Sequence, residues 1–466
     1  MRDADKPAYL AIADAIAEDI QSGRLVASQV LPTMRHLAKV LDLNFTTVAR
    51  GYGEARRRGL IDSKAGRGTF VRQILRSQAV RTPSSVGLID MTMNMPPEPQ
   101  DPSILQMLRV GFSGLAQLAD PFSVLRYQEF GGTPHDRDAG ARWLGRSVPG
   151  VSAQRVLVCP GVQSALLALF TILARPGDTI CCESVTYPGI KGIAAHLGIR
   201  LKGLPADDEG IHPDAFAAAC AVGPPKALYL NPTLLNPTTA VMSQQRREAV
   251  AAIAQRYSVP IIEDDAYGRL PLRSPPPLAT LIPELTFYIT GLAKCVGAGL
   301  RVAYTIAPNV RYAARLAATL RTTVVMPMTL SVALATRWID DGTADAVASA
   351  VREESRMRQA MAAEVLGRAR YVSKPEAFHL WLAVPEPWNR VEFATHLRSQ
   401  GVGVVLSDTF TVADTPPQAV RVCLGGPANR EECRHSLEII ADALEHFPAL
   451  ASGSPVAALA ANACGA

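Results

Sequence analysis

The stretch YITGLAKCVGAGLRVAY, residues 288–304, carries the most specific chemical signal in the chain. Lys294 follows an apolar, strand-like run, and a lysine is a poor choice for a buried core unless its amine is used. Thr290 and Arg301 flank the lysine, and the planar fork of an arginine suits bidentate contact with a phosphate group. The stretch therefore predicts a reactive lysine beside an anion-binding site.

Short apolar runs alternate with Ala- and Leu-rich helical stretches from about residue 91 onward. This alternation is typical of an α/β fold in which helices cover both faces of a mostly parallel sheet. We therefore expect an α/β body over residues 91–450. The strand-like runs are RVLVC at 155–159, TICCE at 179–183, ALYL at 227–230, VPIIED at 259–264 and TFYIT at 286–290.

Other functional candidates stand at the ends of these expected strands. The turn after RVLVC contains Gly161, Val162 and Gln163 and opens a helix, whose first N–H groups can bind an anion. Asp264 ends the run VPIIED, and α/β proteins bind ligands at the carboxyl ends of parallel strands. Asp265 is an alternative for the same position. These residues add a carboxylate to the predicted anion site.

The combination matches what pyridoxal 5′-phosphate needs from a protein. The cofactor requires a lysine amine for a Schiff base, a carboxylate against its pyridine nitrogen, donors for its phosphate and an aromatic ring over its face. Lys294 and Asp264 meet the first two needs. Tyr187 is a candidate to stack on the ring, and Asn236 and Tyr267 are candidates to contact the phenolic oxygen. We expect this cofactor and no metal site.

The body resembles the fold-type I aminotransferases, because GVQSALLALF, NPTLLNPTTA, EDDAYGRLP and GLAKCVGAGLRVAY match that family in order and spacing. The resemblance implies the same roles for the residues above and adds a small C-terminal α/β subdomain. It also implies that Arg421, in AVRVCLGG, binds a ligand carboxylate and that Tyr127, in LRYQEFGG, reaches the phosphate of a neighbouring subunit in a homodimer. No serine stands just before Lys294, so Thr290 is left to contact the phosphate.

The first 71 residues are patterned as a separate small domain. Ile12, Ile16 and Ile20 recur every four residues, as on one face of a helix. Thr33 and Asn44 are suitable N-caps for two further short helices. Two short helices joined by a tight turn are typical of a helix-turn-helix, whose second helix enters the major groove of DNA. The expected elements are helices over 8–22, 34–41 and 45–58 and a hairpin around 63–71.

This domain resembles the winged helix-turn-helix of the GntR family through LPTMRHLAKVL, TTVARGY, RRRGLI and GRGTFV. It departs from that family at Ser28, where a turn glycine is usual, and at Phe45, where a polar residue is common. Gly51 and Gly53 also lie inside the recognition helix. The pattern and the resemblance together predict DNA contacts by Arg35, Thr46, Thr47, Arg50, Lys64 and Arg67.

Charge supports the division of the chain. Residues 1–76 contain 13 Lys and Arg and 8 Asp and Glu, and so carry the whole net charge of +5. This charge is compatible with a solvated basic face and with a surface that binds a polyanion.

No apolar run approaches the roughly 20 residues that span a membrane, and the eight cysteines form no C-x-x-C pair. We expect a cytoplasmic, nucleoid-associated protein with a head over 1–73, a linker over 74–90 and a disordered tail over 451–466.

A GntR-like head joined to an aminotransferase-like body is the architecture of the MocR subfamily of bacterial transcription regulators, which this chain resembles. The resemblance implies that the head binds double-stranded operator DNA. It also implies that the body senses pyridoxal phosphate, or a small amine or amino acid, through a Schiff base at Lys294. An active aminotransferase with an accessory DNA-binding domain remains the alternative, because Lys294, Asp264 and Arg421 form a complete set.

Overall fold

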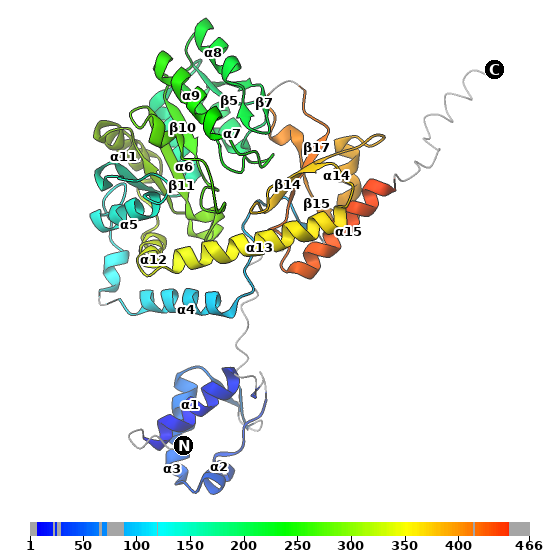
Figure 1. Cartoon of the computed structure of the whole chain (residues 1–466). Helices are drawn as coiled ribbons and strands as arrows, with labels where there is room; N and C mark the ends of the chain where they lie inside the picture. The colour runs from blue at the N-terminus through cyan, green and yellow to red at the C-terminus, as the bar shows by residue number, and fades with distance from the viewer. Residues whose placement is uncertain are drawn as a thin grey trace, which may run out of the picture. The chain divides into compact units, whose positions relative to one another are not determined.

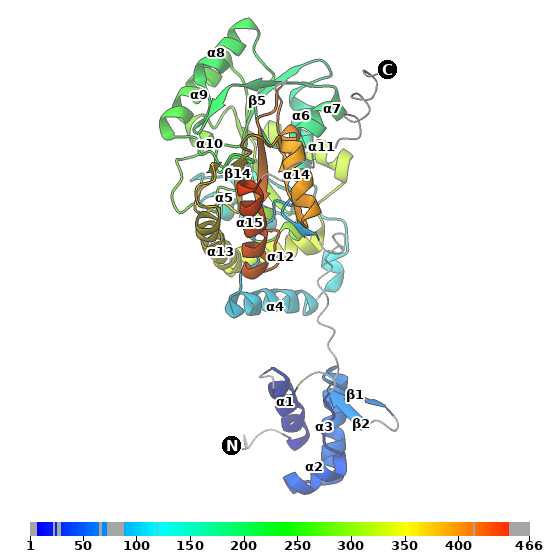
Figure 2. The ribbon, with the colours of Figure 1, turned by 90° about the vertical axis from the view of Figure 1, so that its right-hand side faces the viewer.

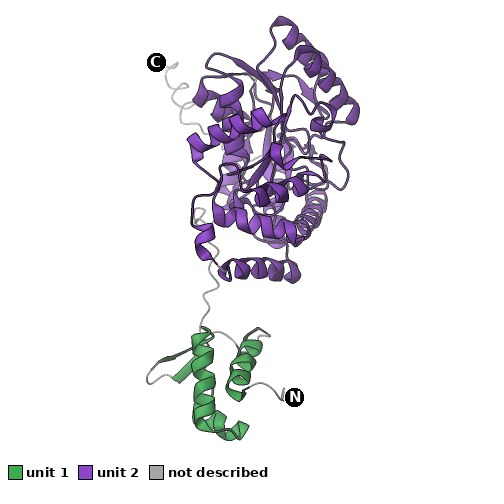
Figure 3. Ribbon diagram, turned by 90° about the vertical axis from the view of Figure 1, so that its left-hand side faces the viewer, with its two compact units in different colours: residues 1–86 green, residues 87–466 purple. Residues whose placement is uncertain are grey.

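The chain forms two compact units, residues 1–86 and 87–466 (Figure 3). The predicted hairpin tip with Arg67, most of the predicted linker and the predicted tail lie outside the described residues, as does the side chain of Lys64. The computed structural model describes residues 7–21, 24–25, 29–64, 68–71, 88–118, 120–412 and 415–446.

The smaller unit contains three helices and a β-hairpin, which confirms the predicted winged helix-turn-helix elements to within one or two residues. The Thr33 side chain accepts a hydrogen bond from the His36 N–H, and Asn44 accepts one from the Thr46 N–H, so both predicted N-caps are present. Figure 2 shows the hairpin beside the third helix. The elements are α1 (Ala8–Gln21), α2 (Met34–Leu41), α3 (Phe45–Arg57), β1 (Ile61–Lys64) and β2 (Gly68–Val71).

The two glycines inside α3 have different environments. A Cβ atom on Gly51 would lie 2.9 Å from Cγ2 of Ile12 and 3.1 Å from the carbonyl oxygen of Tyr9, both on α1. Gly51 therefore lets α1 and α3 approach closely. A Cβ atom on Gly53 would have no heavy atom within 4 Å. Only the first of these glycines is required by packing within the head.

The larger unit is built on a seven-stranded sheet in the order β4-β12-β11-β10-β9-β5-β6. Only β12 runs antiparallel to its neighbours, β11 and β4, so the sheet is mostly parallel as predicted. The five strand-like runs all lie in this sheet. Its strands are β4 (Val156–Cys159), β5 (Thr179–Glu183), β6 (Arg200–Leu204), β9 (Ala227–Leu230), β10 (Ile261–Asp264), β11 (Thr286–Gly291) and β12 (Ala303–Ile306).

Helices cover both faces of this sheet, as the alternation along β9 illustrates. Leu228 and Leu230 pack in one hydrophobic cluster, whereas Tyr229 packs in another, because successive side chains of a strand point to opposite faces. The surrounding helices are α5 (Pro134–Leu144), α6 (Val162–Leu173), α7 (Pro188–Leu197), α8 (Pro213–Val222), α9 (Gln244–Tyr257), α10 (Leu278–Leu281), α11 (Val310–Val324) and α12 (Thr329–Asp340).

The predicted C-terminal subdomain is a four-stranded antiparallel sheet in the order β13-β14-β17-β16. The long helix α13 packs against α15 and reaches back to α4 and α12 of the main sheet region (Figure 1). The elements are α4 (Pro102–Ala116), β13 (Tyr371–Val372), β14 (His379–Ala383), β16 (Val405–Leu406), β17 (Ala419–Cys423), α13 (Thr343–Leu366), α14 (Arg390–Ser399) and α15 (Arg430–Glu445).

The body begins earlier in the chain than the sequence predicted. Strand β3 (Ile89–Asp90) pairs in parallel with β15 (Val402–Gly403), so the linker expected over 74–90 ends before Ile89. A two-residue strand is too short to give a periodic pattern.

Within the described part of the chain, no helix combines the length and the apolar character needed to cross a membrane. The remaining short elements are β7 (Ala206–Asp207), β8 (Gly210–Ile211), η1 (Pro121–Val124), η2 (Ala153–Arg155), η3 (Leu292–Lys294), η4 (Ala298–Leu300) and η5 (Ser407–Thr409).

Candidate functional site

A cavity of about 190 Å³ lies at the carboxyl ends of β9, β10 and β11. This is the edge at which parallel sheets bind ligands. Asn94, Asn231 and Ala293 also line it. Among the described residues, no cluster of His, Cys, Asp and Glu could hold a metal ion there or elsewhere. The cavity brings together eight of the residues predicted to bind the cofactor, namely Val162, Gln163, Tyr187, Asn236, Asp264, Tyr267, Lys294 and Arg301.

Lys294 ends η3, directly after β11. Its amine donates a hydrogen bond to the backbone carbonyl of Asn94 and lies 6.0 Å from the centre of the Tyr267 ring. Burial lowers the pKa of the amine to about 8. A larger neutral fraction near pH 7 makes the amine a better nucleophile toward a carbonyl group.

Asp264 is the last residue of β10 and is 3% exposed. Its Oδ2 accepts a hydrogen bond of 2.8 Å from the Tyr229 hydroxyl, whereas its Oδ1 has no partner. Burial raises the pKa of this carboxyl to about 6. Asp265 accepts a 2.6 Å hydrogen bond from the Tyr288 hydroxyl and does not line the cavity. The geometry therefore favours Asp264 over Asp265 as the carboxylate that meets a ligand.

The predicted anion site surrounds the N-terminus of α6. Gly161 has φ +86°, a region that suits glycine, and its Cβ would lie 3.0 Å from Nη2 of Arg301. Thr290 is 2% exposed, and its hydroxyl has no hydrogen-bond partner. Gly161 and Thr290 adjoin the cavity through their neighbours Val162 and Gly291. A buried unpartnered hydroxyl, a guanidinium and free helix N–H groups fit a phosphate group.

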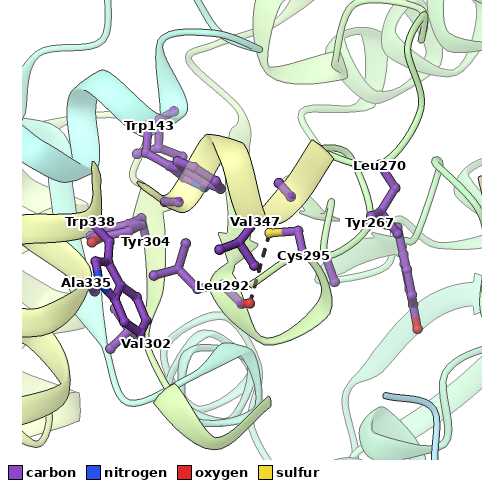
Figure 4. Packing of buried hydrophobic residues seen from close by; sticks show 14 of the residues in the cluster. Trp143, Tyr267, Leu270, Leu292, Cys295, Val302, Tyr304, Ala335, Trp338 and Val347 are labelled. Carbon is purple, nitrogen blue, oxygen red and sulfur yellow. Dashed lines mark hydrogen bonds between the residues drawn. The ribbon is translucent and has the colours of Figure 1, made fainter. Parts of the chain in front are cut away.

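Two tyrosines are fixed at the cavity by neighbouring amides. The Tyr187 hydroxyl donates to Oε1 of Gln163 at 3.0 Å, and the Gln163 amide donates to the Gly189 carbonyl at 3.3 Å. The Tyr267 hydroxyl accepts a 2.8 Å hydrogen bond from the side chain of Asn94. Figure 4 shows Tyr267 at the margin of the core with its hydroxyl directed away from the cluster. Both rings are thus held for contact with a flat ligand.

Arg421 lies on β17 and is 6% exposed. It donates to Oδ1 of Asn236 at 2.8 Å and to the carbonyl oxygen of Thr92 at 2.6 Å, and its guanidinium carbon lies 4.8 Å from the centre of the Phe410 ring. Asn236 thus links Arg421 to the cavity. Tyr127 is 82% exposed and is not among the residues that line the cavity.

Several residues of the site were not predicted from the sequence, including Thr92, Asn94 and Tyr229. Nor was Asn231, whose amide donates to the Asp264 carbonyl at 2.7 Å and whose Oδ1 accepts from the Asn236 N–H at 3.0 Å. The Asn231 N–H donates to the buried Glu183 carboxyl at 3.0 Å. The first Asn-Pro-Thr of NPTLLNPTTA carried this signal, because its asparagine directly follows a buried strand.

Four of the six predicted DNA contacts lie on α2 and α3. Arg35, Thr46 and Arg50 are exposed, and Thr47 is half-buried. The Thr46 hydroxyl donates to Oδ1 of Asn44 at 2.9 Å, so its oxygen is left to accept. The guanidinium carbon of Arg50 lies 4.5 Å from the centre of the Tyr9 ring. This stacking gives Arg50 a defined position at the side of α3.

Two protein families match separate parts of the chain. The family described as bacterial regulatory proteins, gntR family, matches residues 8–71. The family described as aminotransferase class I and II matches residues 88–440, which is most of the chain. The two matches follow the division between the two compact units.

Several relatives of this chain are named as regulators, and one of them matches it over nearly its whole length. The uncharacterised HTH-type transcriptional regulator YdeF of Bacillus subtilis is 28% identical over 440 residues, covering 94% of each chain. The probable rhizopine catabolism regulatory protein MocR of Rhizobium meliloti is 27% identical, covering 66% of each chain. The vitamin B6 salvage pathway transcriptional repressor PtsJ of Salmonella typhimurium is 28% identical, covering 63% of this chain and 66% of PtsJ.

Solved aminotransferases share the fold of the body. The crystal structure of an archaeal alanine:glyoxylate aminotransferase superimposes with a TM-score of 0.71 and 25% identity, covering 78% of this chain and 92% of that one. A TM-score of this size over nearly the whole partner indicates the same fold. The chain therefore belongs to the aminotransferase class I and II family and carries a gntR-family domain ahead of it, the architecture of the MocR-type transcription regulators.

Proposed function

We propose that this protein is a DNA-binding transcription regulator whose body binds pyridoxal 5′-phosphate at Lys294 and responds to a small amine or amino acid. The observation that carries this proposal is the pairing of a half-buried lysine in the cavity with two buried polar atoms that lack partners, Oδ1 of Asp264 and the hydroxyl of Thr290. A pyridine nitrogen and a phosphate would supply the missing partners. The relative PtsJ is a transcriptional repressor of a vitamin B6 salvage pathway, which is compatible with such a ligand.

Each polar group around the cavity would have one task in holding this cofactor. Asp264 would face the ring nitrogen, and Tyr187 would cover the ring. Asn236 and Tyr267 would contact the phenolic oxygen. When bound, the cofactor supplies an aldehyde for the Lys294 amine and an electron-withdrawing ring. The phosphate would be held by Gly161, Val162, Gln163, Thr290 and Arg301.

Arg421 supports a carboxylate-bearing effector. A bound carboxylate would accept hydrogen bonds from the guanidinium in place of the Thr92 carbonyl. Arg421 contacts Asn236, so the effector would lie next to the cofactor site. An amino acid has both a carboxylate for Arg421 and an amine that can exchange with Lys294. This favours an α-amino acid over a simple amine.

A homodimer is the proposed assembly. Phe122, Leu125, Tyr127 and Met328 are each more than 60% exposed. The two segments that carry them are held together, since the Thr329 hydroxyl donates to the Val124 carbonyl. A gathering of exposed apolar side chains marks an interaction surface. Such a dimer would bring Tyr127 to the partner's phosphate site. It would also supply two heads for the two half-sites of an operator. We propose that the protein acts in the cytoplasm, on the nucleoid.

The first experiment titrates the purified full chain with pyridoxal phosphate. The wild-type chain and the control Lys374→Ala, an exposed lysine, should develop visible absorbance, and Lys294→Ala should not. The affinity for DNA fragments from its own genome should change at least about 5-fold with the cofactor and an amino acid, the usual lower range of allosteric coupling. A chain that stays colourless would contradict the cofactor site, and a chain that never retards DNA would contradict the regulator.

An active aminotransferase is the second candidate, because Lys294, Asp264 and Arg421 are assembled at one site. The two functions make different predictions. An enzyme converts an amino acid and a keto acid over many turnovers, whereas a sensor stops after a stoichiometric reaction. Product formed per chain, measured over hours, separates the two.

The DNA-reading surface has its own test. Replacing Arg50 and Arg67 together with alanine should weaken DNA binding and reduce the salt dependence of the binding constant, because phosphate contacts release counterions. The exposed body residue Arg175, changed to alanine, serves as the control and should leave both unchanged. Equal salt slopes for the double variant and the wild type would exclude these arginines from the interface.

A further inference from the structure

The segment of residues 89–95, called the 89–95 segment below, passes through the candidate cofactor site. Its strand β3 pairs with β15, and the carbonyl of Met91 accepts a 3.0 Å hydrogen bond from the Cys423 N–H of β17. Any Cβ on Gly425 or Gly426 would come within 1.8 Å of the carbonyl oxygens of Met95 or Asp90, respectively. These two glycines leave the space through which the segment runs.

Two carbonyl oxygens of this segment accept hydrogen bonds from two of the cationic groups at the site. The Lys294 amine donates to the carbonyl of Asn94, and the Arg421 guanidinium donates to the carbonyl of Thr92 at 2.6 Å. The Asn94 side chain also donates to the Tyr267 hydroxyl at 2.8 Å. The segment therefore contacts Lys294, Arg421 and Tyr267, and the proposed function requires each of these three to contact the cofactor or the effector.

Ligand binding would remove these donors. When the Lys294 amine attacks an aldehyde, a C=N bond forms and one water leaves, so the nitrogen retains at most one proton and is drawn toward the ligand. A carboxylate on Arg421 competes directly with the neutral carbonyl of Thr92, because charge-assisted hydrogen bonds are the stronger ones. A partly buried carbonyl that loses its donor is unfavourable, so the segment must shift or find water.

We propose that Thr92 and Asn94 are positioning residues that report the state of the site to the head. The inference rests on the proposed function and names how that site is regulated. With the site free of ligand, Lys294 and Arg421 hold the 89–95 segment in the position described. A C=N bond at Lys294 withdraws the donor from the Asn94 carbonyl, and an effector carboxylate withdraws the Arg421 donor from the Thr92 carbonyl, so the loss of either contact loosens the segment. In the sequence, Leu88 directly precedes the segment and follows the stretch that joins the two units. Release of the segment would therefore act on this connecting stretch.

Hydrogen exchange on the full chain tests this proposal without any substitution. The amides to follow are those of Cys423, bonded to Met91, and of Ile89, bonded to the Gly401 carbonyl at 2.7 Å. Pyridoxal phosphate followed by L-alanine should accelerate exchange at both amides at least about 5-fold while protecting amides around the cofactor. Unchanged or slower exchange at both amides, in a chain whose visible absorbance proves cofactor binding, would overturn the proposal.

A variant adds a functional readout. Asn94→Ala removes the donor to the Tyr267 hydroxyl, and we expect it to shift the pH at which the visible absorbance changes and to reduce the effect of L-alanine on DNA affinity to less than about 2-fold. Glu98→Ala, an exposed position beyond the segment, is the control and should respond like the wild type. A full DNA response and an unchanged absorbance profile in Asn94→Ala would contradict the role of Asn94. If the wild type develops no visible absorbance with pyridoxal phosphate, the proposed function itself is contradicted.

A second inference concerns Phe45, which is the first residue of α3. Its ring is 48% exposed, and the adjacent Asn44 and Thr46 are hydrogen-bonded to each other in the N-cap. The first turn of the second helix in a helix-turn-helix faces base edges in the major groove. Thymine alone presents a methyl group there, and apolar side chains recognise it by contact. We infer that Phe45 selects thymine at one position of each half-site.

The test compares thymine with deoxyuridine, which lacks only the methyl group. Sites selected by the full chain from a random duplex library are resynthesised with single thymines replaced. One replacement in a single half-site should weaken wild-type binding about 4-fold, the ratio expected for one buried methyl group. Phe45→Ala should bind both duplexes equally, whereas Val40→Ala, a 63% exposed residue of α2, should keep the difference. Normal DNA binding with no deoxyuridine effect would refute the role of Phe45 alone.

Discussion

Burial gives Lys294 its chemistry by lowering the pKa of its amine from 10.5 to about 8. At pH 7 roughly a tenth of such amines are neutral, against roughly one in three thousand at a pKa of 10.5. We therefore expect the rate at which cofactor absorbance develops to rise with pH up to about 8 and then to level off. Rapid-mixing absorbance from pH 6 to pH 10 measures this profile. A rate that climbs tenfold per pH unit through pH 10 would contradict it.

The Tyr229 hydroxyl should control the charge of Asp264. Burial raises the pKa of this carboxyl to about 6, and the Tyr229 hydrogen bond opposes that rise. Tyr229→Phe removes the donor, so the pKa rises further and less carboxylate is present at pH 7. Cofactor affinity should fall about 10-fold at pH 7 and recover at higher pH, as the carboxyl ionises. Tyr288→Phe, which removes the donor to Asp265, is the matched control and should bind the cofactor normally in the same absorbance titration.

The site residues that could be predicted from the sequence lie at or just after the end of an apolar, strand-like run. Asp264 ends a buried strand and Lys294 lies three residues beyond another, where a charged side chain is unexpected without a use. Asn94 could not be identified, because its partners Tyr267 and Lys294 are 173 and 200 positions away and no periodic pattern surrounds it. Tyr229 lies inside the apolar run ALYL, so its hydroxyl gave no separate signal.

The recognition helix α3 offers a matched pair of substitutions. Gly53→Ala should stabilise the head by about 0.5–1 kcal/mol, because the new methyl group meets no atom and the helix loses a flexible residue. Gly51→Ala should instead destabilise it by about 1–3 kcal/mol, because its Cβ would press on Ile12. Hydrogen exchange of the α1 and α3 amides in the full chain measures both free energies. Equal effects at the two positions would contradict the close crossing of α1 and α3.

Helices and strands were predictable where the hydrophobic period was long enough. The helices of the head and the five apolar strands of the main sheet follow their expected ranges closely. The antiparallel direction of β12 could not be predicted, because direction depends on the connection between strands and not on the residues within them. The edge strand β6, RLKGL, was missed because its composition is too polar for a buried run.

Assembly should depend on the exposed apolar side chains near η1. Leu125→Asp places a charge among them, and we expect the proposed dimer to dissociate to monomers in sedimentation velocity at micromolar concentration, because an unpaired charge in an apolar interface is strongly unfavourable. Val222→Asp, at a 90% exposed position on α8, is the control and should leave the mass unchanged. A variant that stays dimeric would place the interface elsewhere. DNA affinity should fall with the dimer, since a monomer brings one head.

The space opened by Gly425 and Gly426 also determines where this body could be joined to a foreign DNA-binding domain. A chimera with its junction ahead of Leu88 keeps the carbonyls of Thr92 and Asn94. It also keeps the 89–95 segment in the space that Gly425 and Gly426 leave for it. A junction placed just before α4, where the first long helix of the body begins, discards them although the main sheet stays intact. The transferable unit for an engineered biosensor therefore starts at Leu88.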